Sequence, residues 1–104
     1  MAFNRGKTYK EMLSAAQDVS SAHWEVLRAP FEQVMEQQQE RMKEISTDWI
    51  RTGISDKALD AQLQELQQIF ILVLEKIPDA DQEICRRATK AAITRFWEAL
   101  MAAL

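Results

Sequence analysis

The chain has 104 residues, of which 47% are hydrophobic and only four are glycine or proline, two of each. Because Gly and Pro make up about 12% of an average protein and provide many of the turns between strands, this composition disfavours a β-sandwich or barrel. With 13 Lys and Arg against 16 Asp and Glu, the net charge is −3, and the chain lacks the basic excess of a nucleic-acid binder. We predict a single all-α domain over residues 1–104.

The first predicted helix begins near Tyr9, after a short disordered segment of about residues 1–7. Thr8 and Glu11 have the spacing of a capping box, in which two side chains satisfy free backbone N–H groups at a helix start. Apolar and small residues then recur every three or four positions as far as Leu27, so one face of this helix is expected to be buried.

The second predicted helix runs from about Pro30 to Thr52 and stops at Gly53, which suits a left-handed helix cap. Proline disfavours helical geometry in the residue before it and fits the first position of a new helix, so Ala29–Pro30 predicts a break. An alternative keeps the first two helices as one long kinked helix, because the apolar stripe stays nearly in phase across Pro30.

The third and fourth predicted helices have clearer ends. Ser55 is a good N-cap for a helix that ends at Pro78, and the segment 79–82 repeats the capping pattern before a helix that continues to the chain end. Four amphipathic helices of about 20 residues with short connections predict an antiparallel up-down four-helix bundle.

His23 and Cys85 have the side chains best suited to catalysis or metal binding, and they are the single histidine and the single cysteine of the sequence. His23 lies on the apolar stripe of the first helix, so we interpret it as a buried structural residue that can hydrogen-bond Gln38. Arg86, Arg87 and the start of the fourth helix would lower the pKa of the Cys85 thiol, but no general base accompanies it. Metal-ligand spacing and glycine-rich phosphate loops are also missing, so we predict no enzyme, catalytic residue, cofactor or metal site.

The stretch from Ala22 to Arg28 resembles the histidine-centred helix of histidine phosphotransfer domains, which are helical bundles of similar size. That resemblance implies phosphotransfer through His23 as an alternative function. The Lys and Gly that follow the histidine in that family are replaced here by residues 25–27, Glu-Val-Leu, and a carboxylate at Glu25 would repel a phosphoryl group.

A helix that faces a core needs about three apolar residues in every seven. Two segments exceed this fraction, namely residues 69–74 and the second half of the fourth predicted helix. Exposed apolar patches usually mark contact surfaces. The main hypothesis is therefore a non-catalytic protein–protein interaction module, an adaptor or regulator that acts as a homo-oligomer or on another protein. Its candidate interface residues are Ile93, Trp97, Leu100, Met101 and Leu104, with Phe70 and Ile71 as a secondary surface.

A second alternative comes from the many glutamines, including residues 37–39 and 67–68, and the scarcity of glycine. This composition is similar to that of phasins, the coat proteins of polyester storage granules, and implies a hydrophobic granule surface as the partner. The longest apolar run, residues 69–74, is far shorter than the roughly 20 residues that span a membrane as a helix. The first residues contain no apolar run long enough for a signal peptide, and a single cysteine cannot form an internal disulfide. We therefore expect a cytoplasmic protein.

Overall fold

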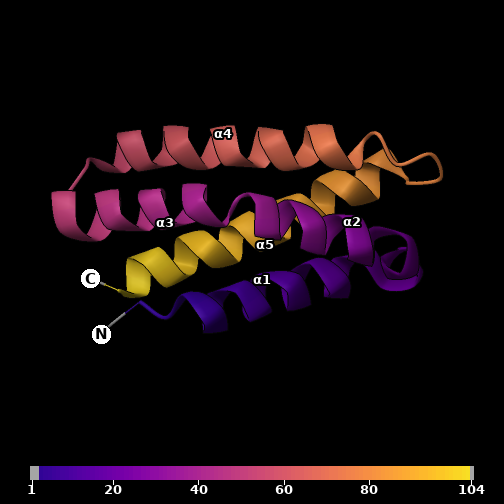
Figure 1. The fold of residues 1–104 in the computed structure, drawn as a ribbon, viewed down its shortest axis with the longest axis horizontal. Coiled ribbons are helices and arrows are strands. Elements are labelled where there is room, and N and C mark those ends of the chain that lie inside the picture. The colour runs from indigo at the N-terminus through magenta and orange to yellow at the C-terminus, as the bar shows by residue number, and fades with distance from the viewer. Residues whose placement is uncertain (1–2, 104) are drawn as a thin grey trace.

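The computed structural model describes residues 3–103, which fold as an antiparallel helical bundle and confirm the predicted fold class (Figure 1). Four segments run alternately up and down. The second of them consists of α2, α3 and a π-helical turn that follow one another almost without interruption. The helices are α1 (Arg5–Ser20), α2 (Trp24–Gln37), α3 (Gln39–Thr47), α4 (Asp56–Leu74) and α5 (Gln82–Ala102), with a 3-10 turn at Ser21–His23 and the π-helical turn at Asp48–Thr52.

Helix α1 begins four residues before the predicted Tyr9. The side chain of Asn4 caps it by accepting a hydrogen bond from the Lys7 backbone N–H at 2.9 Å. Thr8 is not the cap, because its hydroxyl donates to the Asn4 carbonyl oxygen at 2.8 Å. Residues 5–7, which we expected to be disordered, therefore belong to the helix.

The first reversal of the chain lies at Ser21, nine residues before the predicted break. Ser21 has φ 49° and ψ −122°, and its N–H donates to the Gln17 carbonyl oxygen, which ends α1. The chain remains helical through Pro30, which lies inside α2, as the continuous alternative expected. Ser21 therefore makes the turn that the sequence pattern assigned to Ala29–Pro30.

We expect Ser21→Gly to stabilise the protein by about 1 kcal/mol, because glycine adopts this positive φ without the steric cost that a side chain incurs. The gain in stability is limited because glycine has more conformational entropy in the unfolded chain, and folding removes it. The midpoint of urea unfolding, followed by helical circular dichroism, measures the change. Ser14→Gly, at an exposed position inside α1, is the control and should lower stability by up to about 1 kcal/mol. A lower midpoint for Ser21→Gly would show that the turn is unstrained.

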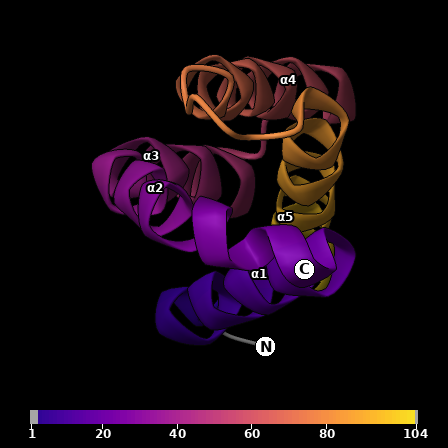
Figure 2. The same ribbon diagram turned by 90° about the vertical axis from the view of Figure 1, so that its right-hand side faces the viewer.

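Helix α5 crosses the bundle obliquely, from the end of α4 to the start of α1 (Figures 1 and 2). Near its beginning Arg86 forms an ion pair with Glu75 at 3.5 Å, and further along Phe96 packs on Phe3 with ring centroids 6.1 Å apart. The most extensive helix pair in the bundle is α1 with α5. Small buried side chains permit this close approach: Ala16, Ala88 and Ala92.

Aromatic side chains join the segments across the core. The Phe31 and Phe70 rings meet edge to face, with centroids 5.6 Å apart, and connect α2 to α4. Trp49, in the π-helical turn, points inward and its indole N–H donates to the Leu100 carbonyl oxygen at 3.0 Å. This hydrogen bond fixes the end of the second segment against the last turns of α5.

Candidate functional site

Some of the predicted interface residues lie in the core of the bundle, and others lie at its surface. Phe70, Ile93 and Leu100 are buried within their own chain, so they cannot form an exposed contact surface, and that part of the prediction needs correction. The reason is that α5 is covered by α1 on one side and by α4 on another, while Phe70 faces Phe31. Trp97 is 43% exposed. Ile71 and Met101 are partly buried, and Leu104 lies outside the described residues.

His23 is exposed in the 3-10 turn between α1 and α2, so the expectation of a buried histidine is wrong. The reversal at Ser21 carries it out of the apolar stripe to the end of the bundle. Within residues 3–103 its side chain makes no hydrogen bond, either to Gln38 or to another group that would orient the ring.

Cys85 is buried near the start of α5, and its thiol lies 3.8 Å from the Leu74 carbonyl oxygen. Burial raises the pKa of the Cys85 thiol, and the nearby carboxylates of Asp81 and Glu75 raise it further. This is opposite to the direction expected from Arg86 and Arg87. Because the thiolate is the reactive form, the structure supports the interpretation of Cys85 as a packing residue.

A groove lies between the first half of α4 and the second half of α5, where the oblique course of α5 takes it away from α4. It consists of two hollows of about 250 and 390 Å³, and Trp97 lines both. We call it the Trp97 groove. Its main lining residues are Asp56, Asp60, Gln64 and Gln67 of α4 and Ile93, Trp97 and Met101 of α5.

The α4 side of the Trp97 groove carries two exposed carboxylates, Asp56 and Asp60. Within residues 3–103 neither carboxylate takes part in an ion pair, and Lys57, which lies between them in the sequence, lines the same hollow. Asp56 is in the first turn of α4, where the helix dipole favours a negative charge. The groove thus combines a large exposed aromatic surface with two carboxylates and one ammonium group, which leaves it with a net negative charge.

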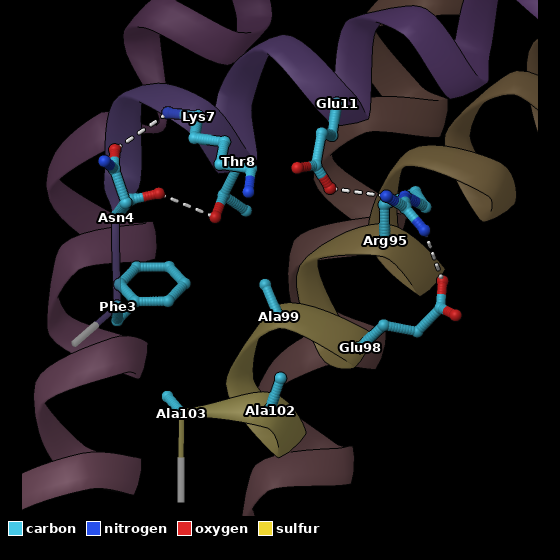
Figure 3. A pocket seen from close by; sticks show the side chains of 10 residues that line it. All are labelled: Phe3, Asn4, Lys7, Thr8, Glu11, Arg95, Glu98, Ala99, Ala102 and Ala103. Atoms are coloured by element: carbon cyan, nitrogen blue, oxygen red, sulfur yellow. Dashed lines mark hydrogen bonds and ion pairs between the residues drawn. The ribbon is translucent and has the colours of Figure 1, made fainter. Parts of the chain in front are cut away.

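A second cavity, of about 460 Å³, lies on the opposite flank of α5, between its last turns and the start of α1 (Figure 3). Its apolar wall includes the Phe3 ring and the small side chain of Ala99. At its polar end Arg95 is held by two carboxylates, Glu11 and Glu98. These three charged groups already satisfy one another, whereas Lys7, which also lines the cavity, forms no ion pair within residues 3–103.

The Trp97 groove and the second cavity have neither histidine nor cysteine in their linings. In the part of the chain that the structure describes, no three His, Cys, Asp or Glu side chains gather in an arrangement suited to a metal ion. Sequence reasoning identified Trp97 but missed Asp56 and Asp60, because the rotation of α4 toward α5 is not encoded in a local pattern.

Comparisons with known proteins add no assignment to this site. No protein-family model, curated protein or solved structure matches the chain. Over residues 3–103, every helix is too short or too polar to serve as a membrane span.

Proposed function

We propose that this chain is a non-catalytic interaction module that docks a segment of another protein in the Trp97 groove. The observation that carries the proposal is the 43% exposure of Trp97 between two hollows. Tryptophan provides a large apolar area at a low cost in conformational entropy and is enriched among residues that dominate binding energy.

The extent of the apolar surface favours reversible docking over permanent assembly. The accessible surface is 6455 Å², close to the roughly 6,000 Å² typical of a monomer of 12.0 kDa. The other exposed large apolar side chains of the described part are dispersed over several helices and turns: Val19, Val26, Ile50 and Leu72. A granule coat would need a continuous apolar stripe, and a permanent dimer would need a larger apolar face, so the oligomer expected from composition is not part of this proposal.

Photo-crosslinking in the native cell tests the proposal. The photoreactive residue benzoylphenylalanine replaces Trp97 in one variant and Leu72 in a matched control, since Leu72 is 52% exposed but lies outside the groove. We expect irradiation to give a discrete covalent adduct with another protein at position 97 and none at position 72. Mass spectrometry then identifies the crosslinked segment. The absence of a specific adduct at position 97, with helicity preserved, would refute docking at this groove.

A further inference from the structure

We infer that the segment docked in the Trp97 groove is a basic amphipathic helix, with two arginine or lysine side chains one helical turn apart beside an apolar side chain. This inference rests on the proposed function and specifies the chemistry of its partner. Its basis is the position of the two unpaired carboxylates, Asp56 and Asp60, next to the exposed indole of Trp97.

The spacing of the carboxylates matches that of cations on a helix. Asp56 and Asp60 are four residues apart on α4, which corresponds to about 6 Å along the helix axis. Both line the same hollow as Trp97 and Met101. Two cationic side chains four residues apart on a partner helix have the same separation, so both charges can be met without distortion of either helix. A helix laid in an apolar groove is a common mode of peptide recognition.

The indole of Trp97 strengthens the preference for cations. A guanidinium group over an indole face gains a cation–π interaction, and arginine also stacks on aromatic rings. The partly buried thioether of Met101 can adapt to the shape of the apolar side chain that accompanies the cations.

The two arginines near the start of α5 are poorly placed to act as this partner from a second copy. Arg86 and Arg87, the arginines near the start of α5, already pair with Glu75 and Glu83 at 3.5 and 3.3 Å. A second copy would therefore have to break its own ion pairs to bring these arginines to the groove. A stable dimer also buries about 800 Å² on each subunit, and one exposed tryptophan with its rim is a small share of that area. These observations favour a separate basic segment over a second copy.

Binding of matched synthetic peptides tests the inference. The probe is a helical peptide with two arginines four residues apart and leucines on the adjoining face, and its counterpart has neutral citrulline at both positions. We expect the arginine peptide to bind roughly five- to thirtyfold more tightly than the citrulline peptide in isothermal titration calorimetry, and to bind less tightly as NaCl is raised. Asp60→Asn should weaken arginine-peptide binding roughly two- to fivefold, and Trp97→Ala about tenfold or more.

The control variant is Asp18→Asn, which removes an exposed carboxylate from α1, the helix farthest from α4 in the cross-section (Figure 2). It should leave the affinity unchanged, and circular dichroism should show equal helicity in all variants. Failure of the arginine peptide to bind would overturn the inference. Equal binding of the citrulline peptide, or a dimer in sedimentation analysis that buries Trp97, would also overturn it. A position-97 adduct with an acidic or neutral segment would refute this inference and leave the proposed docking function standing.

Discussion

Replacement of Phe70 by alanine is expected to lower the free energy of unfolding by about 3–5 kcal/mol. The ring is 0% exposed and packs edge to face on Phe31, so its removal leaves a cavity between α2 and α4. The loss combines the apolar area no longer removed from water with the contacts that the cavity walls forfeit. Urea unfolding of the wild type and the Phe70→Ala variant, followed by circular dichroism, gives the difference.

Leu72→Ala is the matched control for Phe70→Ala, because it truncates an apolar side chain two residues further along the same helix. Leu72 is 52% exposed, so its truncation should change stability by no more than about 0.5 kcal/mol. If Phe70 were a surface contact residue, as the apolar pattern of residues 69–74 suggests, the two variants would behave alike. A loss below about 1 kcal/mol for Phe70→Ala would contradict its place in the core.

Trp49→Ala is expected to be as costly, at about 3–5 kcal/mol, because it removes a large buried side chain together with a hydrogen bond across the bundle. Trp49 is 6% exposed, and its indole N–H donates to the Leu100 carbonyl oxygen. Trp49→Phe should cost less, about 1–2 kcal/mol, because the aromatic ring remains and the Leu100 carbonyl oxygen still accepts from the Ala103 N–H at 3.3 Å.

Thermal or urea unfolding of Trp49→Phe and Trp97→Phe separates these contributions, since both variants make the same chemical change. Trp97 is 43% exposed and makes no hydrogen bond through its indole within the described residues, so its variant should lie within about 0.5 kcal/mol of the wild type. Equal effects at the two positions would show that the Trp49 hydrogen bond contributes nothing to stability.

Local signals predicted the end of the second segment and the starts of α4 and α5, but α4 ends at Leu74, four residues before the predicted Pro78. Gly53 takes the left-handed conformation, with φ 68°, and Ser55 and Asp81 cap α4 and α5 through their side chains, as the sequence indicated. The turn at Ser21 was missed because a serine carries no turn signal comparable to glycine or proline, and its positive φ is imposed by the packing of α1 against α2. Pro30 was given too much weight as a helix break, because a proline inside a helix is tolerated when surrounding contacts hold the helix together.

The candidate site was only partly predictable. The apolar pattern measures how much of a helix can be buried, but it does not say which helix will be covered on two sides. Ile93 and Leu100 are therefore buried, and Trp97, on the same helix, is exposed. The position of Asp56 and Asp60 beside Trp97 depends on how far α4 and α5 diverge and on their relative rotation, so only the tertiary structure shows it.

The first and last helices run in opposite directions, and both ends of the described chain lie at the same end of the bundle (Figure 1). Mechanical tension applied between these ends would load the contacts of α1 and α5 in sequence, beginning at Phe3 and Phe96. Helices α1 and α5 would separate one turn at a time, instead of losing all their contacts in a single step. Resistance to pulling would consequently be low, because only a few contacts carry the load at any moment.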